Sequence, residues 1–384
     1  MSVSRRAFLS GACTLAAHPL VTPMAFATAQ GDHRLVVILL RGGMDGIDAI
    51  RPVGDPGLQR LRPDGMTELG FELDRFYQAS AGFNKLKPLW DRGDLAFVQA
   101  VSTPYRDKRS HFDGQDILEA GVAELGDARD GWLNRLLGLM PGSTARTAFA
   151  VGHEEMKIFK GDAPVMNWSP DARLTLTAQD RLLLDHIYKS DDAFRVAMSD
   201  AYMLLEETPS DVAMNGLPRR GAEVELARFA ASQLLDDTRI ASFSINGWDT
   251  HRRQARDLYR SLDALSEVLL TLREDLGPVW SQTTVVAMTE FGRTAALNGT
   301  LGTDHGTGGA MVLAGGAVRG GRVYGDWPGL SEADLYARRD LMPTADVRAY
   351  AGSVIGDLFG IGQSDLERHV FPGLSLENRP SVIL

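Results

Sequence analysis

Acidic side chains and histidines gather where apolar, strand-like runs meet glycine-rich sequence. Asp45 lies between glycines after the run at residues 35–40, and Asp249 and His251 follow the run at residues 240–245. An aspartate and a histidine two positions apart on extended chain point the same way, which suits a shared metal ion. An isolated Asp-Gly pair is more often a turn, so Asp45 gains weight only from the other clusters.

Two further clusters place an acidic residue near a basic one. Glu290 and Arg293 follow the apolar run at residues 284–288, so an acid and a base come directly after a buried strand. Asp304 and His305 are adjacent in a glycine-rich loop, an arrangement that is unusual for a plain loop. For this last pair we prefer a metal site to a purely structural loop.

A metal site in this chain must use oxygen and nitrogen ligands, because the one cysteine, Cys13, lies in the amino-terminal segment. Mixtures of Asp, Glu and His do not separate zinc, manganese, iron, calcium and magnesium, so one or two divalent ions of any of these kinds are admissible. Such ions activate a nucleophile and stabilise an oxyanion, which is a common solution for the hydrolysis of phosphate or sulfate esters.

A basic loop at residues 106–109 ends at an expected helix start, Ser110. The amino end of a helix beside cations binds anions and lowers the cost of ionising a serine hydroxyl, so Ser110 is a candidate nucleophile. Together with Asp113, three positions further on, the same serine also has the pattern of a plain helix cap. From the local sequence both interpretations stay open.

Six apolar runs of strand length alternate with longer helical patterns. We interpret the runs as buried parallel strands, and leucines spaced by three or four across residues 258–276 predict a long helix covering one face of a sheet. Residues 179–206 and 219–236 are predicted helices as well. The alternation predicts a doubly wound α/β sheet, whose ligands bind outside the carboxyl ends of the strands. The six runs are residues 35–40, 95–101, 147–151, 240–245, 284–288 and 310–313.

The first 29 residues are expected to be an export signal that takes no part in the fold. The chain reads SRRAFL from Ser4, continues without acids through an apolar stretch, and reaches small residues before Ala29. This order resembles a twin-arginine signal peptide, which predicts the twin-arginine export machinery as a partner and a periplasmic or secreted location. No later run approaches the roughly 18 apolar residues of a membrane span, so we expect no transmembrane segment.

Residues 30–384 are expected to form a single α/β domain, with a possible insertion or cap around residues 127–218. The alternative, that this region continues the sheet through residues 147–152, stays open. A net charge of −10 over 384 residues repels a phosphate backbone, which argues against a general nucleic-acid binder.

Five motifs spread along the chain form a recognisable set. They read RGGMDGID (41–48), RSHFDGQD (109–116), GWDTH (247–251), TEFGRT (289–294), and TDHG with GGRVYGDWPGL (303–306 and 320–330). Together they resemble the DUF1501 family of exported bacterial proteins over essentially all of residues 30–384. That family is similar to the alkaline phosphatases and sulfatases. The resemblance implies an alkaline phosphatase-like three-layer α/β sandwich with a mostly parallel central sheet and a metal site at the strand ends.

By position, the resemblance places Ser110 and His111 in the region of the nucleophile. The chain departs from the family motif at Thr307, where the family carries a second histidine, and this departure bears on whether a second ion binds. The metal ligands implied by the resemblance are Asp45, Asp249, His251, Glu290, Asp304 and His305.

We expect an exported, metal-dependent hydrolase of phosphate or sulfate esters on small molecules or glycans. Ser110 or a hydroxide held by the metal would attack the ester, with Arg109 and Arg293 as partners of the oxyanion. The alternative is a non-catalytic cell-envelope protein that binds or assembles anionic glycans with a degenerate site. A nicotinamide or flavin oxidoreductase does not fit, since GGMDG rather than GxGxxG follows the first strand.

Overall fold

The structure, a computed structural model, describes residues 32–64, 66–126, 128–152, 155–169 and 221–384. The expected signal peptide at residues 1–29 and the predicted helix at residues 179–206 lie outside the described residues. Within the described ranges, no helix combines the length and the apolar character that a membrane crossing requires.

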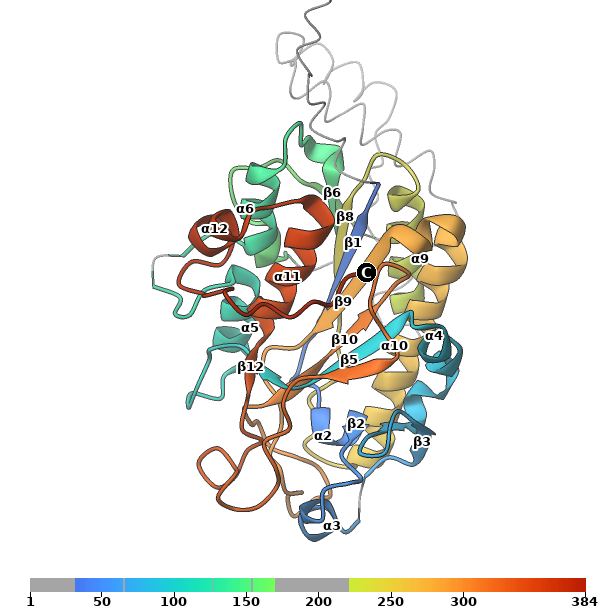
Figure 1. The fold of residues 1–384 in the computed structure, drawn as a ribbon, viewed down its shortest axis with the longest axis vertical. Helices are drawn as coiled ribbons and strands as arrows, with labels where there is room; N and C mark the ends of the chain where they lie inside the picture. The colour runs from blue at the N-terminus through green and yellow to red at the C-terminus, as the bar shows by residue number, and fades with distance from the viewer. Residues whose placement is uncertain (1–31, 65, 127, 153–154, 170–220) are drawn as a thin grey trace, which may run out of the picture. The chain divides into compact units, whose positions relative to one another are not determined.

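One large sheet dominates the described residues and runs in the order β11-β5-β10-β9-β1-β8-β6-β7, with β12 paired to β5 (Figure 1). Each of the six apolar runs predicted as a strand is a strand of this sheet. The strands are β1 (Arg34–Leu40), β5 (Leu95–Ser102), β6 (Ala148–Val151), β7 (Met166–Trp168), β8 (Ile240–Ile245), β9 (Thr283–Met288), β10 (Gly309–Ala314), β11 (Arg322–Tyr324) and β12 (Ala345–Asp346).

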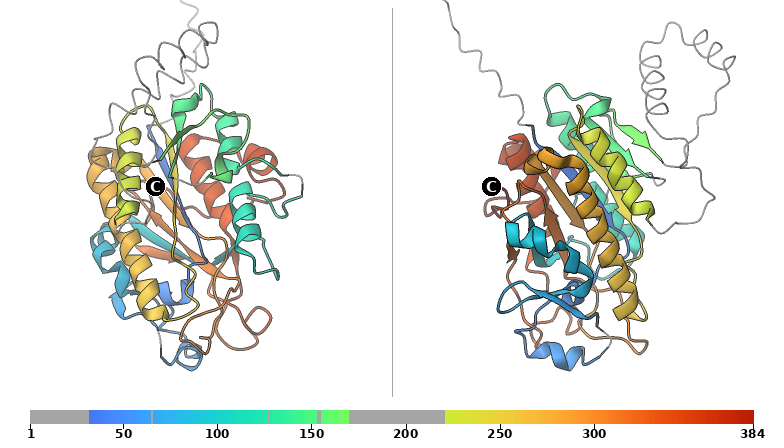
Figure 2. Two further views of the ribbon diagram at one scale, coloured as in Figure 1. Left: turned by 180° about the vertical axis from the view of Figure 1, so that it is seen from behind. Right: turned by 90° about the vertical axis from the view of Figure 1, so that its right-hand side faces the viewer.

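Alternate side chains of β1 enter two separate hydrophobic cores, one on each face of the sheet. Val36 and Ile38 belong to one core, whereas Leu35 and Val37 belong to the other. A strand in the middle of such a sheet is buried on both sides, which explains why its sequence is a continuous apolar run. Figure 2 shows helices on both sides of the sheet, which confirms the predicted three-layer α/β arrangement.

Helices cover the two faces in separate groups. The α9 and α10 helices confirm the predictions made for residues 219–236 and 258–276, and every leucine of the α10 stripe is fully buried. One face carries η1 (Ala81–Leu86), α4 (Lys87–Arg92), α9 (Ala222–Leu234) and α10 (Gln254–Leu276); the other carries α5 (His111–Ala120), α6 (Trp132–Leu139) and α11 (Val347–Phe359). Short helical turns are η2 (Ala145–Thr147), η3 (Lys157–Phe159), η4 (Gly277–Gln282), α12 (Gln363–Asp365) and η5 (Leu366–Val370).

The prediction that all six strands are parallel was wrong for β10. This strand pairs antiparallel with both β9 and β5, whereas β1 is parallel to β8 and β9. The reversal matters for the site, because the residues that precede an antiparallel strand lie at the same edge as the residues that follow its parallel neighbours. Asp304 and His305 precede β10 and therefore reach the edge formed by the carboxyl ends of the other strands.

A small antiparallel sheet, β2-β4-β3, lies between β1 and β5 in the sequence. Its elements are α2 (Gly46–Ala49), β2 (Ile50–Arg51), α3 (Gly57–Leu61), β3 (Leu69–Glu72) and β4 (Gln78–Ser80). In the region of the possible insertion, β6 and β7 join the main sheet, as the alternative interpretation has it. The rest of that region, from residue 170 onward, lies outside the described residues.

Candidate functional site

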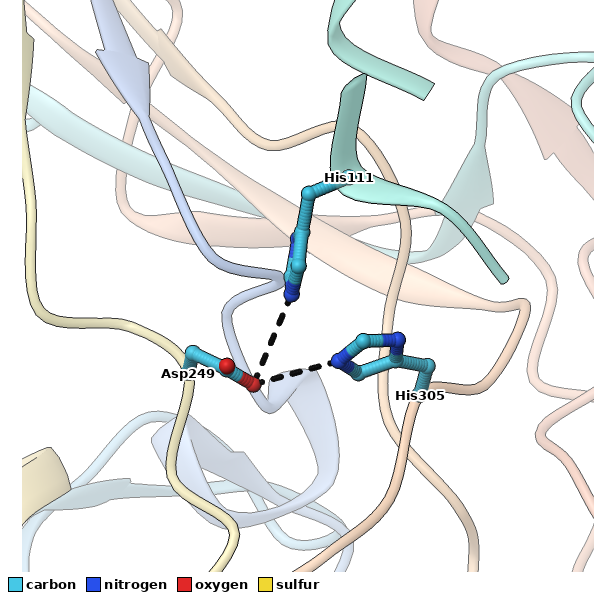
Figure 3. Close-up of side chains that lie close together, drawn as sticks. All are labelled: His111, Asp249 and His305. Atoms are coloured by element: carbon cyan, nitrogen blue, oxygen red, sulfur yellow. Dashed lines mark hydrogen bonds and ion pairs between the residues drawn. The ribbon is translucent and has the colours of Figure 1, made fainter. Parts of the chain in front are cut away.

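Three predicted site residues from distant parts of the chain converge at the carboxyl edge of the sheet. His111 is the first residue of α5, Asp249 follows β8, and His305 lies in the loop before β10. Figure 3 shows the three side chains pointing toward one another, and their ligand atoms all lie within 4.8 Å of one another. A separation of this size allows one ion to contact all three side chains.

Asp249 Oδ1 is the centre of this cluster. It lies 3.5 Å from His111 Nε2, and 3.0 and 3.2 Å from Nε2 of His251 and His305. The Nε2 atoms of His251 and His305 are themselves only 3.0 Å apart. Three imidazoles therefore aim the same ring nitrogen at one carboxylate oxygen.

The other ring nitrogen of each histidine contacts an oxygen of the protein. An Nδ1–H that donates to such an oxygen leaves the Nε2 lone pair free for a metal, and this is how most metal-binding histidines are held. The Nδ1 partners are Glu290 Oε1 at 2.7 Å for His111, Asp304 Oδ1 at 3.3 Å for His251, and the Arg109 carbonyl at 2.9 Å for His305.

The charges of the cluster compensate one another. Burial alone would raise the pKa of Asp249, but contacts with His111, His305 and Arg293 outweigh it and hold that pKa well below its usual range. For His111 burial acts in the opposite direction and would lower the pKa. The contacts with Asp249 and Glu290 outweigh the effect of burial and raise this pKa to about 9. His111 Nε2 is buried without a hydrogen-bond partner, which is the condition expected of a ligand atom without its ion.

Glu290 stands behind His111 and outside the three-residue cluster. Its side chain is almost fully buried, and Oε1 accepts hydrogen bonds from Gly42 N at 2.9 Å and from Gln115 Nε2 at 3.2 Å. Despite burial, the contacts with His111 and the backbone lower the pKa of Glu290, so it remains a carboxylate. The structure therefore places Glu290 where it orients a histidine.

Gly42 is required at its position by the approach of the Asp249 loop. Its φ of +124° lies in the left-handed region, and a Cβ there would come within 2.5 Å of Asp249 N. The absence of a side chain lets the loops after β1 and β8 approach closely, while the Gly42 amide donates to Glu290.

The structure does not bring Asp45 into the cluster. Its Oδ1 caps α2 by accepting from Asp48 N at 3.2 Å, and its Oδ2 pairs with Arg62 Nη1 at 2.7 Å and accepts from the Gln254 side chain. Both oxygens of this buried carboxylate are thus held by the protein itself.

Arg293 is fully buried directly behind Asp249. Its Nη1 donates to Asp249 Oδ1 at 2.7 Å, and its Nε donates to Thr303 Oγ1 at 3.1 Å. The guanidinium compensates the charge of Asp249 from the protein side. The sequence predicts that Arg293 contacts a substrate oxyanion, whereas the structure directs its donors to Asp249, Thr303 and the Gly42 carbonyl.

Ser110 caps α5. Its Oγ accepts from Asp113 N at 3.4 Å, and its own amide donates to Tyr105 Oη at 2.6 Å. The cap uses the oxygen of the hydroxyl as an acceptor and does not use its hydrogen. The Ser110 hydroxyl can therefore still donate its proton. Arg109, the residue before it, has an exposed side chain and a left-handed backbone with φ of 54°.

Three residues that the sequence analysis did not select complete the network behind His111. Gln115 Oε1 accepts from Arg41 Nη1 at 3.0 Å, and the same nitrogen lies 2.9 Å from Glu119 Oε1. His111, Gln115 and Glu119 are spaced by four residues on α5, so they share one face of the helix. The four-residue spacing from His111 is the sequence signal that identifies Gln115 and Glu119.

Thr307 takes part in a structural hydrogen bond. Its hydroxyl donates to Asp340 Oδ2 at 2.9 Å, and both side chains are buried. The neighbouring Arg339 donates to the His305 carbonyl at 3.0 Å. The loop at residues 336–340 therefore packs directly against the loop that carries His305.

Three solved structures illustrate what the chain is similar to. The C-terminal periplasmic domain of EcEptC from Escherichia coli is 10% identical, with a TM-score of 0.42 over 89% of this chain and 86% of that one. The lipoteichoic acid synthase LtaP from Listeria monocytogenes is 8% identical, with a TM-score of 0.36 over 68% of this chain and 56% of that one. A protein in the alkaline phosphatase superfamily from Vibrio parahaemolyticus is 12% identical, with a TM-score of 0.35 over 86% of this chain and 67% of that one.

The match with LtaP spans little more than half the length of that structure, 56%. No curated protein sequence matches the chain. Residues 100–371 match the family described as Protein of unknown function (DUF1501), a range that holds His111, Asp249 and His305. The chain therefore belongs to the DUF1501 family, as its motifs predicted.

Proposed function

We propose that this protein is a metal-dependent hydrolase of phosphate or sulfate esters. The observation that carries the proposal is the convergence of three imidazole Nε2 atoms on Asp249 Oδ1, with each Nδ1 held by an oxygen of the protein. Histidines held in this way are pre-oriented for a metal, and the buried Nε2 of His111 has no other hydrogen-bond partner.

The donor set narrows the choice of ion. Three imidazoles and one carboxylate suit zinc or iron, whereas magnesium and calcium prefer sites made of oxygen ligands. We therefore propose one transition-metal ion held by His111, Asp249, His251 and His305. When bound, such an ion supplies Lewis-acid stabilisation of the charge that develops on an ester oxygen.

The protein contributes an anion site and a nucleophile next to this cluster. The free amides at the start of α5 favour a negatively charged group, and Ser110 stands at that position with its hydroxyl proton available. The exposed Arg109 is the cation for the ester oxygens on the solvent side. Arg293 holds Asp249 ionised and in place, because its donors bond within the protein.

The proposal includes export. The amino-terminal sequence SRRAFL, with the acid-free apolar stretch behind it, supports passage through the twin-arginine machinery to the periplasm or the exterior. This route carries folded proteins, which agrees with a site assembled from segments 194 residues apart, His111 and His305.

The test combines metal analysis with an ester screen. Protein purified without chelators should hold one zinc or iron ion per chain, and it should hydrolyse an aryl phosphate or an aryl sulfate. His305→Ala should lose both the ion and the activity. His369→Ala is the matched control, because that histidine is exposed on η5 and contacts only a surface aspartate at 3.7 Å among the described residues.

Two results would overturn the proposal. Folded wild-type protein without stoichiometric metal would remove the basis of the mechanism. A stoichiometric ion without turnover of either ester class would instead favour the non-catalytic role in binding anionic glycans.

A further inference from the structure

The loop at residues 103–110 is braced at several points beside the cluster. The Ser110 amide donates to Tyr105 Oη at 2.6 Å, and the Arg106 guanidinium folds back onto the carbonyls of Thr103 and Tyr105. His305 Nδ1 contacts the Arg109 carbonyl at 2.9 Å. These contacts fix the position of the loop relative to the proposed ligands.

Its backbone is held in a conformation that ordinary residues avoid. Asp107 and Arg109 have φ values of 65° and 54°, and Ala337 and Arg338 in the facing loop have 49° and 56°. Left-handed backbone at non-glycine residues persists only where surrounding contacts impose it, and such positions cluster at functional sites. The strain sets the directions in which the cationic side chains of the two loops leave the backbone.

In the part of the chain that the structure describes, Asp107 forms no ion pair with Lys108 or Arg109 and instead contacts the facing loop. Both oxygens of Asp107 accept from the hydroxyl of Tyr336, at 3.1 and 3.2 Å, and this contact joins the loop to residues 336–340. Among the described residues, neither Lys108 nor Arg109 makes an ion pair. Arg338 has only an exposed contact with Glu332, at 3.7 Å. These three cations, Lys108, Arg109 and Arg338, form what we call the basic rim.

Two cations without an ion pair among the described residues, Lys108 and Arg109, are notable in a chain whose net charge is −10. Burial raises the pKa of Asp340 in the second loop, and the charge of Arg109 opposes that rise. Exposed cations attract anions over about 8 Å at physiological salt. The basic rim begins at the backbone contact with His305, so an anion bound there lies next to an ester at the cluster.

We propose that Lys108 and Arg338 of the basic rim bind a second anionic group of the substrate, so that the natural substrate is an ester carrying a further phosphate, sulfate or carboxylate beside the group that is cleaved. This inference deepens the proposed function and rests on it. The ion, Arg109 and the start of α5 are enough to bind the single charged group of a simple monoester. Lys108 and Arg338 therefore remain to bind a second anionic group beside it.

The kinetic test uses two substrates that differ by one anionic group. An aryl phosphate is compared with the same aryl phosphate carrying a second phosphate on the ring, and the ratio of their kcat/KM values gives the preference. In Lys108→Gln/Arg338→Gln this preference should fall about tenfold, through a higher KM for the doubly charged substrate. Added salt should reduce the preference of the wild type in the same direction.

The matched control is Lys87→Gln/Arg368→Gln, which makes the same charge change on α4 and η5. Both cations are exposed; among the described residues the Lys87 side chain contacts Asp91 on α4, and the Arg368 side chain contacts Asp365 and the Ser364 carbonyl on the adjoining α12. The preference should stay at the wild-type value in this control. An equal fall in both variants would show a general charge effect and would overturn the proposal.

A binding experiment separates this proposal from the hydrolase proposal. Inorganic tripolyphosphate is titrated into chelator-treated full-length protein by calorimetry, where no turnover occurs. The wild type and the control variant should bind it at least about tenfold more tightly than Lys108→Gln/Arg338→Gln.

The outcomes distinguish the two proposals. If simple esters are hydrolysed but the rim variant keeps both the preference and the tripolyphosphate affinity of the wild type, the basic rim is wrong and the hydrolase stands. If no ester is hydrolysed but tripolyphosphate binding depends on Lys108 and Arg338, the hydrolase is wrong and the rim remains an anion site.

Discussion

Asp249 is the residue on which the site depends, because four cationic or metal-binding groups meet its carboxylate. Its side chain is 44% exposed, whereas Arg293 behind it is fully buried. One side of the carboxylate is therefore neutralised by the protein, and the other is open to a ligand. The histidines around it have their own carboxylate or carbonyl partners, and those partners determine how well an ion is held.

Asp304→Ala should weaken metal binding about tenfold, the lower end of the range for residues that orient a ligand, because Asp304 is half exposed. The reason is that His251 loses the oxygen that holds its Nδ1. A competition titration with a chromophoric chelator measures the affinity. Asp365→Ala, which removes a carboxylate from the exposed His369, is the control; equal affinities in the two variants would contradict the positioning role of Asp304.

Substitutions at Ser110 test whether this helix-capping residue is also the nucleophile. Asn caps helices about as well as Ser, whereas Ala costs about 1 kcal/mol. Ser110→Asn should therefore keep the wild-type stability in urea unfolding, Ser110→Ala should lose about 1 kcal/mol, and both should lose ester hydrolysis. Hydrolysis at the wild-type rate by the stable Ser110→Asn protein would show that Ser110 only caps.

At the scale of elements, α5 carries a polar face into the site. His111, Gln115 and Glu119 lie one helical turn apart, and Arg41 and Glu290 interleave with them from the ends of two strands. Negative and positive groups alternate along this row, so each holds the next in place. The helix thereby fixes the ring of His111 as well as its backbone.

Gln115→Met should test this row, because it keeps the volume of the side chain and removes both amide contacts. We expect a stability loss of about 1 kcal/mol and several-fold weaker metal binding, since Glu290 loses one donor and Arg41 loses one acceptor. Gln363→Met on α12, where the amide contacts the exposed Glu367, is the control. Unchanged metal affinity in Gln115→Met would show that the row serves folding alone.

The α11 helix provides a test of stability against pH. Burial, with Asp326 and Tyr324 nearby, raises the pKa of Tyr350 to about 12, from 10.0. The unfolded chain releases this proton near pH 10 and the folded chain near pH 12, so rising pH favours unfolding across that window. Tyr350→Phe should lose less stability between pH 10 and 12 than the wild type, by up to about 2 kcal/mol. Denaturant unfolding at pH 7 and pH 11 gives the difference; equal losses would contradict it.

At the scale of the whole molecule, one buried ion pair joins the amino-terminal part of the chain to the site loops. Arg62 is fully buried, pairs with Asp45 at 2.7 Å, and donates to the carbonyls of Thr294 and Ala295 at 2.7 and 2.8 Å. The small sheet and the loop that follows β9 are thereby held together. A buried pair of this kind adds little net stability when intact but is costly to break.

Arg62→Met should destabilise the protein by about 3 kcal/mol or more, because it leaves the Asp45 charge buried without a cation to compensate it. The double variant Asp45→Asn/Arg62→Met should recover part of that loss, and urea unfolding measures both. A double variant as unstable as the sum of its single changes would contradict this explanation. Metal analysis of Asp45→Asn, which we expect to retain the ion, tests separately whether Asp45 is a ligand.

The sequence by itself determined the elements of this protein. Continuous apolar runs marked the buried strands, and the leucine spacing marked α10, because burial on both faces and a helical stripe leave different periodicities. The position of acids, histidines and glycines beside those runs also marked the edge where His111, Asp249 and His305 meet. Gln115 and Glu119 were not selected from the sequence, although their four-residue spacing from His111 on α5 indicates a shared helix face.

Only the tertiary structure decided the direction of β10 and the partners of each site residue. A central strand is buried on both faces whether it runs parallel or antiparallel to its neighbours. Its apolar run therefore does not indicate the direction of the strand. The reversal of β10 is what brings Asp304 and His305 to the site edge. The family resemblance implied that Asp45 is a metal ligand like Asp249, yet it pairs with Arg62, because long-range packing, and not local pattern, determines which charge a carboxylate meets.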